Sequence, residues 1–151
     1  AQKIQDKAKV GSDKGAHLYL FSFKFHLHLQ KLHEFPDSEM MKATLSDLMK
    51  KIPGPASAEW PMGEPFTQAF VHGSMSVEVY APRGIDIQTP HDQDELYFIH
   101  SGQGEIVVAG GRQRCEPGMV FFVAANAEHR FENFSDDFCT WVVFWGPKGG
   151  E

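Results

Sequence analysis

The chain has few cysteines, few basic residues and no long apolar run, and each shortage excludes a class of protein. Its 151 residues include two cysteines, Cys115 and Cys139, too few for a disulfide framework, so buried thiols and a cytoplasmic location are expected. Lys and Arg number 14 against 20 Asp and Glu, a formal net charge of −6. This charge argues against nucleic acid or an anionic membrane as a partner. The most apolar N-terminal run, residues 18–29, is interrupted by a lysine and two histidines, and spanning a membrane needs about 20 apolar residues.

The length and composition predict one soluble globular domain with flanking segments. The chain is 42% hydrophobic and 23% charged, which is close to the average for such proteins. A domain of this size buries enough surface to fold without a metal or disulfides, so any metal site is expected to serve function. We divide the chain into an N-terminal extension (1–40), a helix and loop (41–65) and a main domain (66–151).

The extension contains one segment with a strong strand pattern, residues 21–29. Polar and apolar residues alternate there, and the apolar face consists of Phe21, Phe23, Phe25, Leu27 and Leu29. We expect this extra strand to pair with a sheet edge, either in its own sheet or at an oligomer interface. His26 and His28 share its polar face at a spacing compatible with metal chelation, but two solvent-facing residues is the preferred interpretation.

The rest of the chain predicts a short helix followed by many short strands. Thr44 is a suitable N-cap, and Leu45, Leu48 and Met49 form an apolar stripe that ends before Pro53. After a loop rich in Pro and Gly, seven strands are expected, at 66–71, 76–80, 96–100, 105–108, 119–123, 129–131 and 138–144. Short strands separated by Gly and Pro turns predict an all-β sandwich or barrel.

The candidate chemistry lies in residues 89–97 and at His129. If residues 89–97 form an extended strand, His91, Gln93 and Glu95 point to the same side. An imidazole, an amide and a carboxylate are donors that suit a first-row transition metal. His129 follows a turn of small residues and can supply a second imidazole from the start of another strand.

The spacing around these candidates resembles the two sequence motifs of the cupin superfamily. Six residues separate Glu95 from Gly102 in the first motif, and three separate His129 from Asn133 in the second. Asn126 stands where the second motif usually has glycine, and asparagine tolerates the left-handed backbone of such a turn.

The first motif departs from the family pattern at one histidine. The spacing from His91 to Glu95 fits the second His and the Glu of the motif, which leaves Thr89 at the first His position. In the alternative register, Gln93 stands where the second His belongs. In both registers one of four ligands is missing or replaced by a weaker one.

The resemblance implies an all-β, single-domain cupin β-barrel, or jelly roll, with a short N-terminal helix and an extra N-terminal strand. It also implies a homodimer and one divalent transition metal (Fe, Mn, Ni or Zn). The metal ligands implied are His91, Glu95 and His129, with Gln93 as a fourth ligand or a hydrogen-bonding neighbour. The aromatic residues implied for a substrate pocket are Tyr97, Phe121, Phe131 and Trp141, together with Phe144.

The resemblance leaves three functional alternatives open. The leading one is a mononuclear non-haem metal dioxygenase that acts on a small organic molecule. The second is a non-catalytic cupin that binds a metal or a small ligand as a sensor or storage module. The third is a metal-free, sugar-type isomerase in which His91 acts as base and Tyr97 as acid.

Overall fold

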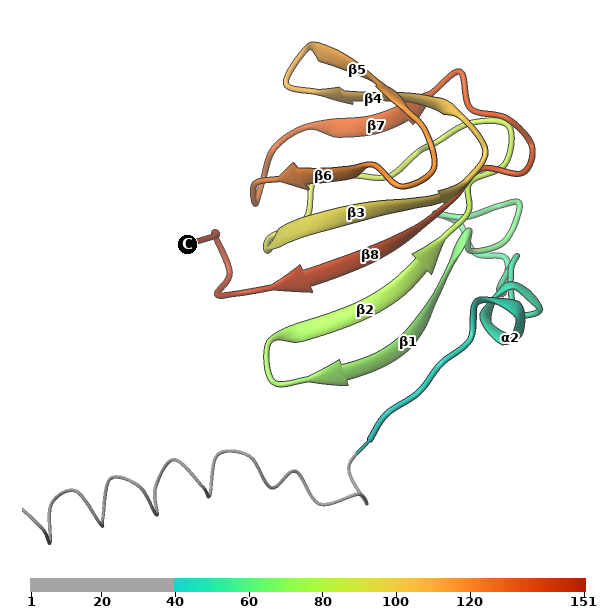
Figure 1. The fold of residues 1–151 in the computed structure, drawn as a ribbon, viewed down its shortest axis with the longest axis horizontal. Helices are drawn as coiled ribbons and strands as arrows, with labels where there is room; N and C mark the ends of the chain where they lie inside the picture. Colours follow the sequence, from blue (N-terminus) through green and yellow to red (C-terminus); the bar gives the residue numbers. More distant parts are fainter. Residues whose placement is uncertain (1–39) are drawn as a thin grey trace, which may run out of the picture. The chain divides into compact units, whose positions relative to one another are not determined.

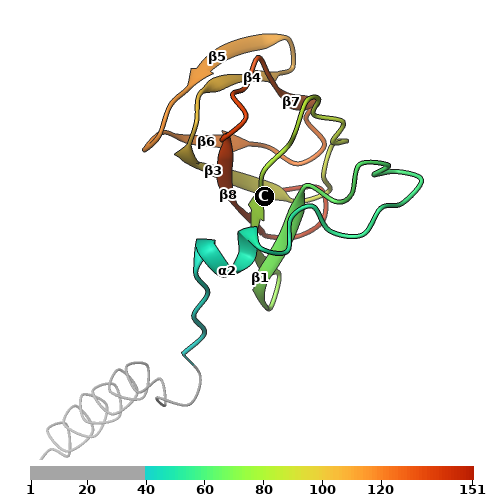
Figure 2. The same cartoon turned by 90° about the vertical axis from the view of Figure 1, so that its right-hand side faces the viewer.

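Two antiparallel sheets enclose the core of the protein, which we describe from a computed structural model over residues 40–151 (Figures 1 and 2). The larger sheet has the strand order β1-β2-β8-β3-β6, and the smaller one has the order β5-β4-β7. The strands are β1 (Phe66–His72), β2 (Met75–Tyr80), β3 (Asp94–Ser101), β4 (Gly104–Val108), β5 (Gly111–Cys115), β6 (Val120–Val123), β7 (His129–Glu132) and β8 (Cys139–Trp145). This mostly β jelly roll confirms the predicted fold class. The strand expected at 21–29, with His26 and His28, lies outside the described residues.

All seven predicted strands are present, and an eighth, β5, was missed. Its sequence, Gly-Arg-Gln-Arg-Cys, has no alternation, because its first four residues are exposed at the edge of the smaller sheet. The two-residue turn before it has left-handed backbone at both positions, with φ of 46° at Ala109 and 84° at Gly110. Such a turn matches the twist of a hairpin, so it pairs β5 with β4 despite the weak strand sequence.

The predicted helix is present as α2 (Leu45–Met49), and it covers one end of the larger sheet. The Thr44 side chain accepts a hydrogen bond from the backbone N–H of Asp47, as expected of an N-cap. Leu48 is buried against Val79 and Cys139 on the outer side of the sheet. The helix therefore shields apolar residues that face away from the space between the sheets.

The main core lies between the two sheets and is largely aromatic. Its buried members are Tyr80, Tyr97, Ile99, Ile106, Cys115, Val123, Phe131, Phe138 and Val142. Both cysteines are buried free thiols, which confirms that prediction, and burial raises the pKa of each thiol to about 11.

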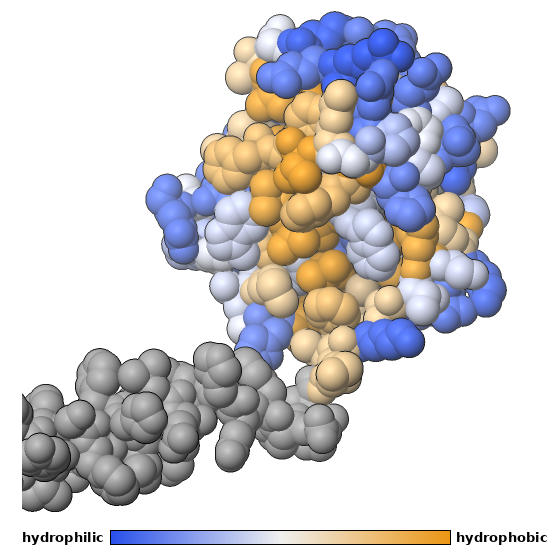
Figure 3. Space-filling view, viewed as in Figure 1, coloured by the Kyte–Doolittle hydropathy of each residue, from blue (hydrophilic) through white to orange (hydrophobic). Residues whose placement is uncertain are grey.

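The outer face of the larger sheet remains apolar beyond the area that α2 covers (Figure 3). Phe98, Val120 and Phe122 on β3 and β6 are 40%, 52% and 58% exposed. The homodimer expected from the sequence stays a prediction. Within residues 40–151, no helix has the length and apolar character needed to cross a membrane.

Gly102, one of the motif glycines, is required for two reasons, and its replacement tests how tightly the sheets pack. Gly102 and Gly84 have the same φ of 73°, but a Cβ atom on Gly102 would lie 2.6 Å from the Phe138 Cα, whereas nothing lies within 4 Å of one on Gly84. Both Gly→Ala variants should lose about 1–2 kcal/mol of unfolding free energy from the backbone strain. We expect Gly102→Ala to lose at least about 1 kcal/mol more in urea unfolding. Equal losses would contradict the close packing of Gly102 on Phe138.

Candidate metal centre

Three side chains from separate parts of the fold converge between the sheets. Glu95 is the second residue of β3, His129 is the first residue of β7, and His91 lies in the irregular segment between β2 and β3. One nitrogen or oxygen atom from each lies within 4.8 Å of those from the other two. The structure thus brings together the three residues that the motif spacing singled out.

The closest contact in the cluster joins Glu95 to His129. Glu95 Oε1 lies 2.8 Å from His129 Nε2, and both side chains are only 1% exposed. The other carboxylate oxygen, Oε2, lies 3.9 Å from His91 Nε2. It is buried and receives no hydrogen bond from any residue in the described part of the chain. An unpaired buried oxygen of this kind is costly, so it marks a place where a cation would be stabilised.

The donor set fits a divalent transition metal. Two imidazoles and one carboxylate suit iron, manganese, nickel or zinc, whereas calcium and magnesium prefer oxygen ligands alone. His91, Glu95 and His129 are therefore the residues that would hold such a metal.

The ring of His129 is fixed by a second contact behind it. Its Nδ1 lies 2.8 Å from the carbonyl oxygen of Ala127, which can only accept a hydrogen bond, so Nδ1 carries a proton. This arrangement directs Nε2 toward Glu95. A histidine that ligates a metal is commonly oriented in this way through its other nitrogen.

A chain of hydrogen bonds runs from a buried carboxylate to the same imidazole. Asp86 Oδ2 accepts a hydrogen bond from Gln88 Nε2 at 2.8 Å, which turns the Gln88 side-chain oxygen toward Tyr97. The Tyr97 hydroxyl donates its single hydrogen to that oxygen at 3.0 Å. Its own oxygen lies 2.9 Å from His129 Nε2 and can therefore accept from it. Burial raises the pKa of Tyr97 well above its usual value, so its hydroxyl stays neutral.

The two histidines of the cluster have opposite pKa shifts. Burial lowers the pKa of His91, and the attraction of Glu95 does not overcome it. Burial also acts to lower the pKa of His129, but the hydrogen bond and charge of Glu95, with the Ala127 carbonyl, outweigh it and raise the pKa. His91 is therefore ready to coordinate at neutral pH, whereas His129 must first lose a proton from Nε2.

His91 is positioned from the second motif rather than by a strand. The backbone N–H of Asn126 donates to the His91 carbonyl at 2.7 Å, and Asn126 has a φ of 62°. The left-handed turn expected at Asn126 is thus present, and it anchors the segment that carries His91. The His91 ring also packs edge-on against Phe144, with ring centroids 4.8 Å apart.

Gln93 does not join the three clustered ligands. Its side-chain Nε2 donates to the carbonyl oxygens of Ser74 at 2.9 Å and Gly146 at 2.8 Å, which ties two turns together. The expectation of a shared face over residues 89–97 is wrong for its first half, because β3 begins only at Asp94. The structure therefore gives no support for Gln93 as a fourth ligand.

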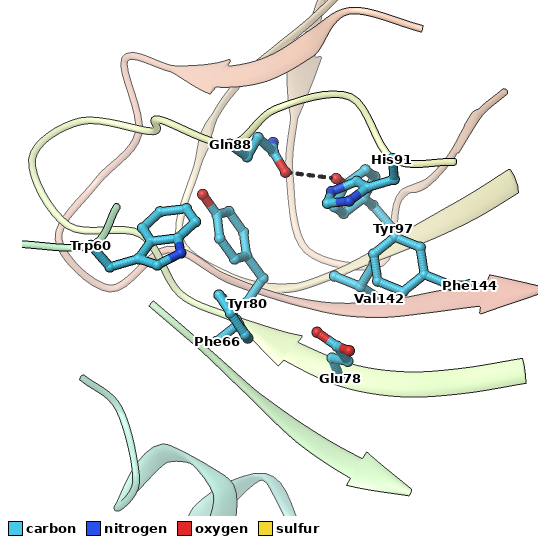
Figure 4. A pocket seen from close by; sticks show the side chains of 9 residues that line it. All are labelled: Trp60, Phe66, Glu78, Tyr80, Gln88, His91, Tyr97, Val142 and Phe144. Atoms are coloured by element: carbon cyan, nitrogen blue, oxygen red, sulfur yellow. Dashed lines mark hydrogen bonds between the residues drawn. The ribbon is translucent and has the colours of Figure 1, made fainter. Parts of the chain in front are cut away.

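A pocket of about 260 Å³ adjoins the cluster (Figure 4). Of the four aromatic residues predicted for it, only Tyr97 is among the lining side chains. Phe131 is buried in the core against Tyr97, Phe121 packs on that core, and Trp141 packs with α2 on the outer side of the sheet. On β8 it is Val142 and Phe144 that face the pocket. The predictions for Phe121, Phe131 and Trp141 are therefore corrected.

Sequence reasoning missed two residues of the pocket wall, Trp60 and Glu78. Trp60 comes from the loop rich in Pro and Gly, which has no periodic pattern to show which way its side chains point. Glu78 lies between two valines, and the usual alternation would turn it outward. In the structure Val79 faces α2, so Glu78 faces the pocket instead.

The comparisons with known proteins agree with this architecture. The family described as "Cupin domain" matches residues 76–145. An uncharacterized protein of Streptomyces coelicolor, SCO3923, is 39% identical over 77 residues, which cover 50% of this chain and 73% of that protein. The transcriptional activator RhaS of Mannheimia succiniciproducens is 33% identical over 60 residues, which cover 40% of this chain and 22% of RhaS. The solved structure of KdgF from Halomonas sp. is 14% identical, with a TM-score of 0.49, and the match covers 55% of this chain and 78% of KdgF.

The jelly roll and the cluster between its sheets define a small β-barrel protein with a candidate metal centre. The chain belongs to the cupin superfamily.

The raised pKa of His129 predicts how metal affinity depends on pH. Protons compete with a metal for Nε2 once the pH falls below the pKa of His129, and because that pKa is raised, competition begins above the usual value of 6.5. Below that pKa, the apparent affinity should fall about tenfold per pH unit. Zn²⁺ competition titrations against a chromogenic chelator between pH 8 and 6 test this, and an unchanged affinity over that range would contradict it.

Asp86 is the main polar support of the site, and its removal should weaken the whole fold. It is 6% exposed and accepts hydrogen bonds from the Tyr80 hydroxyl at 2.6 Å and the Phe131 backbone N–H at 2.7 Å, besides those from Gln88. We expect Asp86→Ala to lose about 2–5 kcal/mol of unfolding free energy, because buried donors are left unpaired. The control Asp92→Ala removes an exposed ion pair with Lys148 and should lose under about 1 kcal/mol. Similar losses in urea unfolding would refute the assigned role.

Proposed function

We propose that this cupin binds one divalent transition metal through His91, Glu95 and His129 and acts on a small organic molecule held in the adjoining pocket. The observation that carries this proposal is the buried Glu95 Oε2, which has no hydrogen-bond donor among the described residues and faces the imidazole of His91. His91 belongs both to the cluster and to the pocket wall, so a molecule in the pocket lies beside the metal ligands.

The donor set favours an oxygen-dependent oxidation, which makes a mononuclear non-haem dioxygenase the leading reaction class. Two histidines and one carboxylate are the ligands of non-haem Fe(II) centres that keep positions open for substrate and O₂. When bound, such a metal supplies Lewis acidity and a template that orients the reactants. The chain itself contributes a fixed His129, through Ala127, and a neutral hydroxyl on Tyr97.

A non-catalytic ligand-binding module is the second candidate. Two observations favour it: both tyrosines on the pocket wall have hydroxyls engaged in hydrogen bonds, and one matched relative is named a transcriptional activator rather than an enzyme. In that case the metal or the pocket binds a ligand without turnover.

Metal analysis of the full chain, purified without a chelating column, tests the metal centre. We expect about one metal per wild-type chain and a loss of at least about tenfold in Glu95→Ala, because three ligands fall to two. The control Glu128→Ala changes an exposed glutamate beside His129 and should retain its metal. A Glu95→Ala protein with full metal content would refute the site.

Oxygen uptake by the loaded protein then separates the two candidates. Substrate-dependent O₂ consumption with a panel of phenols, thiols, keto acids and amines supports the dioxygenase. Stoichiometric metal with no consumption supports the binding module.

A further inference from the structure

Glu78 places a carboxylate on the wall of an otherwise aromatic pocket (Figure 4). On the sheet it lies directly opposite Gln68 of β1 and Val142 of β8. Residues opposite each other in adjacent strands share a face, and Val142 is buried toward the core. Glu78 therefore points to the inside of the larger sheet, where the metal centre also lies.

The charge of this pocket has one sign. Of its nine lining residues, Glu78 is the single acidic one, none is Lys or Arg, and burial keeps His91 neutral by lowering its pKa. Burial raises the pKa of Glu78, with a smaller contribution from Glu95, while the side-chain amide of Gln68 opposes the rise. The Glu78 carboxylate is thus partly desolvated, and no cationic side chain of the pocket compensates it.

Aromatic rings surround the part of the pocket that Glu78 faces. Trp60 and Phe66 stand edge to face with centroids 5.7 Å apart, and Tyr80 lies beside them on the wall (Figure 4). The faces of such rings attract cations, most strongly when water is excluded. The Tyr80 hydroxyl donates to Asp86 at 2.6 Å, so it offers an acceptor oxygen and no hydrogen to a ligand.

We propose that the pocket selects a small organic cation, a substituted ammonium whose charge is held by Glu78 and the rings of Trp60, Phe66 and Tyr80. This inference deepens the proposed function, since it names the substrate class of the same site. An anion would meet the unpaired carboxylate of Glu78, and a neutral molecule would leave that carboxylate desolvated without a partner. The ammonium group resolves both problems, and the rest of the molecule can extend toward His91.

Calorimetric titration of the full-length protein with a matched pair of ligands tests this. The probes are choline and 3,3-dimethylbutan-1-ol, which share a shape but differ in charge. We expect wild-type protein to bind choline at least about tenfold more tightly than the neutral alcohol. Equal affinities, tighter binding of the alcohol, or no choline binding at all would overturn the proposal.

Two variants assign the preference to its source. Glu78→Gln keeps the shape of the side chain and should abolish the tenfold preference, whereas the exposed control Glu128→Gln should retain it. Trp60→Leu keeps Glu78 and should weaken choline binding more than alcohol binding, which covers the case of a Glu78 variant that does not fold. A full preference in both Glu78→Gln and Trp60→Leu would refute the assignment.

The same titration on Glu95→Ala separates this inference from the metal proposal. If wild-type protein carries no metal but prefers choline, the metal proposal fails and the cation pocket stands. If the metal is present and the preference is absent, the cation pocket fails alone.

Discussion

The contact between Glu95 and His129 is the interaction on which this molecule depends. It joins β3 of the larger sheet to β7 of the smaller one, at 2.8 Å and with both side chains nearly free of solvent. A buried ion pair contributes little net stability, because the cost of removing two charges from water offsets their attraction. Its presence, with Glu95 Oε2 left unpaired, is therefore better explained by a bound cation than by folding.

Three carboxylates around the pocket have different surroundings, which suit different tasks. Asp86 accepts four hydrogen bonds and fastens the segment between β2 and β3 to the barrel. Glu95 has one short contact and one unpaired oxygen, as a metal ligand requires. Glu78 faces aromatic rings across open pocket space, where it can meet a ligand. Because Gln88 and Tyr97 connect Asp86 to His129, the support of the fold also orients the metal centre.

The sequence predicts the architecture well because its strands and turns are encoded locally. Motif spacing was enough to select His91, Glu95 and His129, and the left-handed turn at Asn126 followed from its residue type. The pocket wall was predicted poorly, since its residues depend on packing between distant segments. Alternation fails for Glu78 because α2 buries the opposite face of β2, and no period assigns Gln93 in a segment that is not yet a strand.

The most direct test of the central claim is anomalous diffraction from crystals of the metal-loaded protein, measured at the absorption edge of the metal. The account predicts one strong peak between the sheets, about 2.0–2.2 Å from a nitrogen of His91, a nitrogen of His129 and a carboxylate oxygen of Glu95. A peak elsewhere, or none there while Glu95 keeps its contact with His129, would contradict it.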